Sequence, residues 1–169
     1  MGKKEQMTLE ESIVQYLMEQ KMTITTVESC TGGMISARLT DVAGVSEVFK
    51  QGFVTYSNKA KRKMVGVKKE TLKEYTAVSE QTAWEMARGG ALEADADVCV
   101  SVTGYAGPPR GKDDDTVGLV YTGCYMKGRI VVEEHRFEGD RREIREQAAE
   151  AALKLVYTCM TQKRKKKKE

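Results

Sequence analysis

Residues 97–104, with the sequence DVCVSVTG, constrain the fold more than any other segment. They form a nearly continuous run of apolar and β-branched residues that ends at a glycine. A strand of this kind has no face suited to water, so it belongs at the centre of a sheet with helices packed on both sides. The run therefore predicts a sheet that is covered on both faces.

The rest of the chain alternates between helical and strand-like patterns. Thr8 and Glu11 form a capping box at the start of the first expected helix. Helices are expected at 8–21, 32–42, 58–66, 68–76, 80–94 and 139–160, and strands at 23–27, 48–57, 97–104, 117–126 and 129–137, the last two as a hairpin. Helices interspersed with buried strands predict an α/β fold, a three-layer α/β/α sandwich with a mixed, mainly parallel sheet.

Charge and length predict a single domain over residues 1–162, followed by a basic tail. Residues 163–169 hold six of the 28 Lys and Arg residues and one of the 25 acidic residues, so the rest of the chain is slightly acidic. Such a run of like charge is expected to be disordered, and nucleic acid would contact it only nonspecifically. With no apolar stretch long enough for a membrane span or a signal peptide, a cytoplasmic protein is expected.

Two of the expected strands end in glycine-rich loops, ESCTGG at 28–33 and VTGYAG at 102–107. Ligands of α/β sheets bind beyond the carboxyl ends of the strands, so these loops predict where the site lies. Ser29 stands at the first strand-to-helix turn, and Gly32 and Gly33 let backbone N–H groups approach an anion closely. Ser29 is either a nucleophile or, like Thr31, a candidate cap of the next helix.

A serine nucleophile requires a base. His135 is the only histidine and lies beside two glutamates on an expected hairpin strand, which favours a solvated face over a Ser-His-Asp triad. Lys61, just past a strand end in YSNKAKRK, is the better candidate, because neighbouring cations and burial lower the pKa of a lysine. The alternative is an ordinary basic helix on the surface.

Other reactive residue types have simpler explanations. Cys30 follows Ser29 directly, and its side chain is expected to point into the packing. Asp113, Asp114 and Asp115 are consecutive on a loop, which favours a solvated turn over a metal site. The four cysteines lie far apart, which argues against structural zinc and favours free thiols.

Several arginines lie at the start of the last expected helix, where their charge opposes the helix dipole. They are Arg141, Arg142 and Arg145. A bound phosphate would explain this placement, and so would surface ion pairs with Glu138, Asp140 and Glu146.

Taken together, several motifs make the sequence similar to a known family. In order and spacing, ESCTGG, VTYSNKAK, AVSEQTA, SVTGYAGP, VGLVY and GDRREIR resemble the CinA C-terminal domain, a family that includes stand-alone nicotinamide-nucleotide amidohydrolases. The similarity spans about residues 8–160, and the chain is expected to be of the stand-alone kind. The resemblance implies hydrolysis of nicotinamide mononucleotide (NMN) to nicotinate mononucleotide and ammonia, without a metal or other cofactor.

The resemblance also implies roles for individual residues. Ser29 would be the nucleophile and Lys61 the base, with Tyr56 assisting. The substrate-binding residues implied are Thr31, Gly32, Gly33, Ser46, Asn58, Thr103, Gly104, Gly107, Arg141 and Arg145, the two arginines meeting the phosphate. Backbone N–H groups at residues 30–33 or 103–104 would hold the oxyanion.

The chain departs from the family pattern in one loop. PRGKDDD replaces much of a glycine-rich segment, and Tyr105 stands where a small aliphatic residue is common. Substrate preference is therefore open. The resemblance suggests a homo-oligomer. The alternative function is a nucleotide-binding or regulatory module of the competence/damage-inducible type, without turnover.

Overall fold

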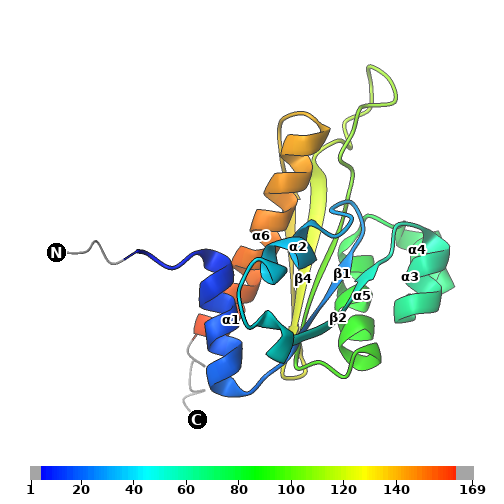
Figure 1. Ribbon diagram of the computed structural model, residues 1–169. Helices are drawn as coiled ribbons and strands as arrows, with labels where there is room; N and C mark the ends of the chain where they lie inside the picture. The colour runs from blue at the N-terminus through cyan, green and yellow to red at the C-terminus, as the bar shows by residue number, and fades with distance from the viewer. Residues whose placement is uncertain (1–4, 163–169) are drawn as a thin grey trace, which may run out of the picture.

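The computed structural model describes residues 5–162 as a three-layer α/β/α sandwich, which confirms the expected fold class (Figure 1). The sheet has the order β2-β1-β3-β4-β5. Its strands are β1 (Ile24–Glu28), β2 (Phe49–Val54), β3 (Val98–Gly104), β4 (Leu119–Met126) and β5 (Arg129–Arg136). Strands β2, β1 and β3 are parallel, and the β4–β5 hairpin continues the sheet with antiparallel pairing.

Helices cover both faces of the sheet. On one face lie α1 (Leu9–Gln20), α2 (Met34–Thr40) and α6 (Arg141–Thr161), which contact one another. On the other face lies α5 (Glu80–Glu93), against which α3 (Asn58–Val65) and α4 (Lys69–Tyr75) pack. A short 3₁₀ helix, η1 (Val45–Glu47), precedes β2.

The predicted central strand is confirmed. Residues 98–103 of β3 are all buried, because α5 packs on one side of them and α6 on the other. The larger apolar cluster lies between the sheet and the α1–α2–α6 layer, and a smaller one lies under α3, α4 and α5. The apolar run at 97–104 thus holds the two layers together.

The local signals at the helix ends also act as expected. Thr8 and Glu11 form the capping box of α1, and the side chain of Ser79 accepts a hydrogen bond at the start of α5. Gly66 ends α3 with φ at 69°, a left-handed conformation that costs glycine little. These boundaries depend on a few neighbouring residues, so the sequence alone predicts them.

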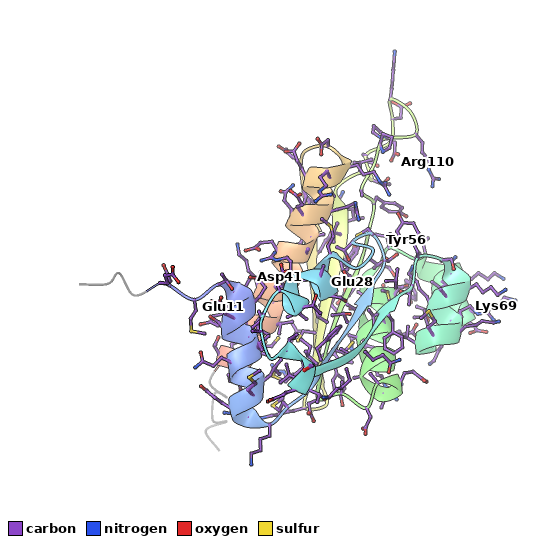
Figure 2. The ribbon with its side chains drawn as sticks, viewed as in Figure 1. Glu11, Glu28, Asp41, Tyr56, Lys69 and Arg110 are labelled. Carbon is purple, nitrogen blue, oxygen red and sulfur yellow. The ribbon has the colours of Figure 1, made fainter. Side chains whose placement is uncertain are left out.

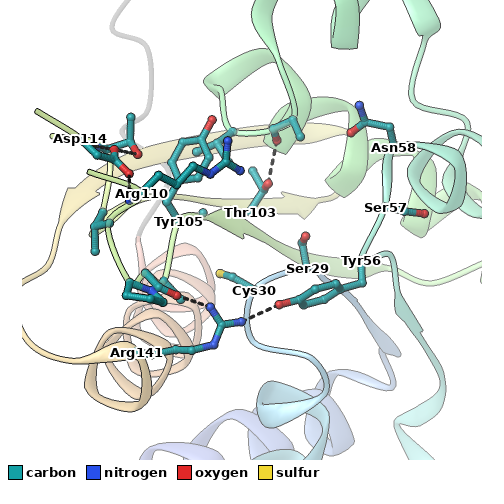
Figure 3. Close-up of a pocket in the computed structure, with 18 of the residues that line it drawn as sticks. Ser29, Cys30, Tyr56, Ser57, Asn58, Thr103, Tyr105, Arg110, Asp114 and Arg141 are labelled. Carbon is teal, nitrogen blue, oxygen red and sulfur yellow. Dashed lines mark hydrogen bonds between the residues drawn. The ribbon is translucent and has the colours of Figure 1, made fainter. Parts of the chain in front are cut away.

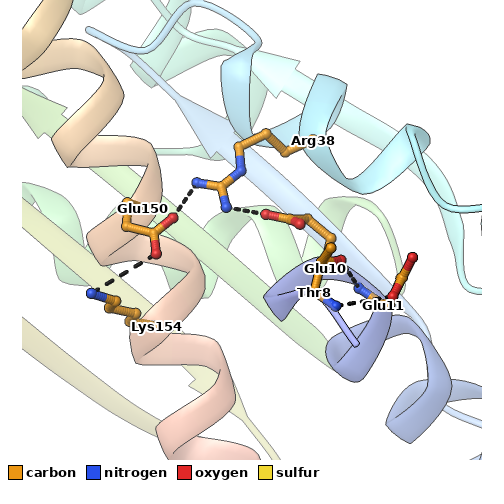
Figure 4. Close-up of polar contacts among 6 residues, drawn as sticks. All are labelled: Thr8, Glu10, Glu11, Arg38, Glu150 and Lys154. Carbon is orange, nitrogen blue, oxygen red and sulfur yellow. Dashed lines mark hydrogen bonds and ion pairs between the residues drawn. The ribbon is translucent and has the colours of Figure 1, made fainter. Parts of the chain in front are cut away.

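A polar contact joins the three helices of one face. Arg38 of α2 pairs with Glu10 of α1 and Glu150 of α6, and Glu150 also lies 3.8 Å from Lys154 (Figure 4). Arg38 therefore connects helices that are far apart in the sequence.

The loop between β3 and β4, residues 105–118, extends beyond the end of the sheet (Figure 1). Tyr56 and Arg110 lie toward this end of the molecule, whereas Glu28 lies inside it at the end of β1 (Figure 2). None of the helices within residues 5–162 has the length and apolar character needed to cross a membrane. The expected basic tail, 163–169, lies outside the described residues.

Candidate active site

A cavity of about 460 Å³ opens where β1 and β3 end. The two strands are parallel, with Glu28 opposite Val102, so the loops that follow them lie side by side. The cavity has the size of a small-molecule site. Its polar and charged lining comprises Ser29, Cys30, Tyr56, Ser57, Asn58, Lys61, Thr103, Tyr105, Arg110, Asp114, Thr116 and Arg141.

Ser29 and Lys61 meet in this cavity. The Nζ atom of Lys61 lies 3.0 Å from the Oγ atom of Ser29 and donates a 2.8 Å hydrogen bond to the main-chain oxygen of Thr55. Ser29 comes from the turn after β1, and Lys61 from the first turns of α3, whose N-cap is Ser57. The two side chains are within the distance needed for proton transfer.

Burial changes the acidity of Lys61. Lys61 is only 2% exposed, and among residues 5–162 no carboxylate forms an ion pair with it. Desolvation therefore lowers the pKa of Lys61 to about 8. A large share of the amine is neutral near that pH, as a lysine base requires. The alternative of an ordinary surface lysine is wrong.

The turn that carries Ser29 is held by Glu28, a residue that the sequence did not single out. Glu28 is fully buried, and its carboxylate accepts hydrogen bonds from Thr31 Oγ1, Ile35 N, Ser36 N and Ser36 Oγ at 2.7–3.1 Å. The N-cap of α2 is Gly33, with φ at 111° and no side-chain cap bond. The expectation that Ser29 or Thr31 caps this helix is therefore wrong, because Glu28 satisfies its first N–H groups.

The side chain of Tyr56 forms its hydrogen bond with Arg141 and not with Lys61. The Tyr56 hydroxyl accepts a 2.8 Å hydrogen bond from Nη2 of Arg141, whose Nη1 donates to the main-chain oxygen of Gly107 (Figure 3). This contact joins the start of α6 to the ends of β2 and β3. Tyr56 is 58% exposed, so its hydroxyl lies at the mouth of the cavity.

The implied substrate-binding residues fall into two groups. Asn58, Thr103, Gly104, Gly107 and Arg141 line the cavity. Thr31, Gly32, Gly33, Ser46 and Arg145 lie outside its lining.

Physical reasons account for the second group. Thr31 is buried and its hydroxyl donates to Glu28, so the side chain is occupied. Ser46 is exposed on η1, which precedes β2 and so lies at the amino end of the parallel strands, away from Ser29. Arg145 donates to the main-chain oxygens of Cys30 and Thr31, at 3.0 and 3.2 Å. Its guanidinium therefore holds the Ser29 turn, and Gly32 lies against it.

The side chains of the other reactive residues lie apart from the proposed chemistry. The expectation of a solvated face for His135 is wrong, because its side chain is 17% exposed, lies 2.8 Å from the buried Thr122 and stacks on Phe137. It lies outside the cavity lining. Cys30 is 5% exposed, and burial raises the pKa of its thiol to about 11, so it is a poor nucleophile at neutral pH. Asp113 and Asp115 are exposed, and Asp114 accepts hydrogen bonds from its own loop.

Within residues 5–162, two of the three arginines at the start of α6 form no ion pair with Glu138, Asp140 or Glu146. Arg142 pairs with Glu146 at 2.7 Å, as that alternative predicts. Arg141 and Arg145 instead bind a tyrosine hydroxyl and main-chain oxygens. Asp140 caps the helix.

Sequence comparisons identify the family of the chain. Residues 6–160 match the CinA C-terminal domain. A CinA-like protein of Kosmotoga olearia is 50% identical over 153 residues, which are 90% of this chain and 37% of that protein, so the chain spans little more than a third of this curated relative.

Solved structures show the same fold. The competence/damage inducible protein CihA of Agrobacterium tumefaciens has a TM-score of 0.86 at 40% identity, covering 91% of this chain and 94% of that one. A CinA superfamily protein of Escherichia coli has a TM-score of 0.84 at 35% identity, covering 90% of both chains. This protein therefore belongs to the CinA C-terminal domain family.

Proposed function

We propose that this protein is an amidohydrolase that converts NMN to nicotinate mononucleotide and ammonia. The observation that carries the proposal is the 3.0 Å contact between Ser29 and a buried Lys61 whose pKa is lowered to about 8. A nucleophile beside a base in a cavity of this size is the arrangement that amide hydrolysis requires. The family membership and its resemblance to stand-alone amidohydrolases support the choice of NMN.

The proposed reaction has two steps. The neutral amine of Lys61 takes the proton of Ser29 as Oγ attacks the carboxamide carbon. The tetrahedral intermediate expels ammonia, which receives the proton from Lys61, and leaves an ester on Ser29. Water, deprotonated by Lys61, then hydrolyses the ester, releasing nicotinate mononucleotide and restoring the serine.

The oxyanion would be held by main-chain N–H groups. Cys30 and Ala106 both line the cavity and lie outside helices and strands. Within residues 5–162 their N–H groups form no main-chain hydrogen bond, and the same holds for other loop residues of the lining, such as Ala77 and Gly107. We propose the N–H of Cys30 for this role, because Cys30 directly follows Ser29 in the chain.

The test is ammonia release from NMN by the full chain and by Ser29→Ala. We expect the parent to turn over and the variant to lose a factor of about 10³ or more in kcat, because it lacks the nucleophile. Unchanged activity in the variant would reject the serine mechanism. A parent that binds NMN without releasing ammonia would favour the non-catalytic nucleotide-binding module.

The pH dependence gives a second prediction. Lys61 acts as a base only when neutral, so kcat/KM should rise with pH through about 8 and level off above it. Initial rates between pH 6 and 10, in buffers of constant ionic strength, measure this profile. A profile that is flat or falls across pH 7–9 would contradict the assignment of Lys61 as the base.

A further inference from the structure

Arg110 lies in the loop where the chain departs from its family's pattern, and the proposed chemistry does not use it. It follows Pro109 in PRGKDDD and lines the same cavity as Ser29 and Lys61. The loop holds it through its main chain, because the N–H of Arg110 donates to Asp114 Oδ2 at 2.9 Å and the N–H of Thr116 donates to Asp114 Oδ1 at 3.0 Å. The backbone at Arg110 is thus fixed by its own loop.

The guanidinium of Arg110 differs from that of Arg141, the other arginine of the cavity. Arg141 already donates through both Nη atoms, to Tyr56 and to Gly107. Within residues 5–162, the Arg110 side chain forms no hydrogen bond or ion pair. The pKa of nearby Asp114 is lowered mainly by the hydrogen bond from the Thr116 hydroxyl, and the charge of Arg110 adds to this effect. In the view of Figure 3, Arg110 lies beside Tyr105, whereas Arg141 lies apart from it and contacts Tyr56.

The charged lining as a whole favours an anion. Arg110 and Arg141 carry positive charge whatever the protonation state of Lys61, and Asp114 is the one acidic residue of the lining. Its carboxylate accepts hydrogen bonds from the N–H groups of Arg110 and Thr116 and from the Thr116 hydroxyl. The Asp114 oxygens are therefore occupied within the loop, whereas the donors of Arg110 are available to a ligand.

We infer that Arg110 binds the phosphate monoester of the substrate and makes the enzyme selective for phosphorylated amides. A guanidinium matches phosphate oxygens with paired, charge-assisted hydrogen bonds, and none of its donors has to leave another partner first. Arg141 donates to Tyr56 and to the main-chain oxygen of Gly107, and Arg145 donates to main-chain oxygens outside the lining. The inference rests on the proposed function for the identity of the amide.

Turnover of two substrates tests the selectivity. NMN and nicotinamide riboside carry the same carboxamide and differ in the phosphate. Arg110→Gln should raise the KM for NMN about tenfold or more with kcat within about twofold, and leave kcat/KM for the riboside nearly unchanged. Lys112→Gln is the matched control, because it removes the same charge from an exposed residue of the same loop outside the cavity lining.

Two results would overturn the inference in this assay. One is an Arg110→Gln variant that behaves like Lys112→Gln toward NMN. The other is an equal loss with both substrates, since a structural role of Arg110 would not distinguish them.

Binding without turnover separates this inference from the proposed function. Ribose 5-phosphate should bind the parent in a calorimetric titration, and bind Arg110→Gln about tenfold more weakly and Lys112→Gln like the parent. Inorganic phosphate should displace it, because the phosphate is the recognised group. If the binding of ribose 5-phosphate depends on Arg110 but the parent releases no ammonia from NMN, the phosphate site is supported and the deamidase proposal fails. The phosphate site would be refuted, even in an active amidase, by any of three results: ribose 5-phosphate fails to bind, binds Arg110→Gln as tightly as it binds the parent, or resists displacement by inorganic phosphate.

Discussion

Lys61→Met should abolish turnover and stabilise the fold at neutral pH. The variant loses the base, so kcat should fall by a factor of about 10³ or more. The side chain is 2% exposed and has no carboxylate partner within residues 5–162, so the protonated parent carries an uncompensated buried charge at pH 7. Methionine fills much of the same space without a charge.

The expected gain in the free energy of unfolding is about 1–3 kcal/mol. It is smaller than the full desolvation cost, because Ser29 and the main-chain oxygen of Thr55 lose their partner. Urea unfolding of parent and variant at pH 7 measures it. Lys59→Met is the control, since Lys59 is exposed on the same helix and should change neither activity nor stability appreciably.

The pH dependence of the gain tests its cause. The folded-state pKa of Lys61 is lowered to about 8, so between this pH and the ordinary lysine value the unfolded chain binds more protons than the folded one. The parent therefore gains stability as pH rises from about 8 to about 10.4, and the advantage of Lys61→Met should shrink over that range. A gain that stays constant up to pH 10.5, or a variant less stable than the parent at pH 7, would contradict this explanation.

Glu28→Ala should destabilise the protein by about 4 kcal/mol or more. The carboxylate is fully buried and accepts four hydrogen bonds, so its removal leaves the N–H groups of Ile35 and Ser36 without a partner and opens a cavity. Glu28→Gln keeps the shape but turns an NH₂ group toward one pair of donors. We expect it to lose about 2 kcal/mol.

Chemical unfolding at pH 7 checks both changes. Glu93→Gln removes an exposed carboxylate from α5 and should stay within about 0.5 kcal/mol of the parent. Because Glu28 precedes Ser29 directly, Glu28→Gln should also lower kcat. If Glu28→Ala were as stable as Glu93→Gln, the carboxylate would not hold the turn.

The sequence alone determined the order of the elements and predicted the edge of the sheet at which the candidate site lies. Helix ends such as the Thr8–Glu11 box and Gly66 depend on residues within a few positions of one another, and the buried run at 97–104 requires cover on both faces. Parallel strands that end in glycine-rich loops then place those loops at one edge of the sheet. The pairing of Ser29 with Lys61 was implied by the family resemblance.

Only the tertiary structure decided what each polar group contacts. Glu28, the last residue of β1, accepts the N–H hydrogen bonds at the start of α2 that Ser29 or Thr31 was expected to accept. Arg145 binds the main chain of the Ser29 turn. Arg110 lines the cavity. The contacts of Glu28 and Arg145 come from the packing of α2 and α6 on the sheet, and the place of Arg110 comes from the loop between β3 and β4. The hydrogen-bond partners of a charged side chain are the groups that the packed fold brings within about 3 Å of it. Short sequence patterns do not predict these partners, because they lie far away in the chain.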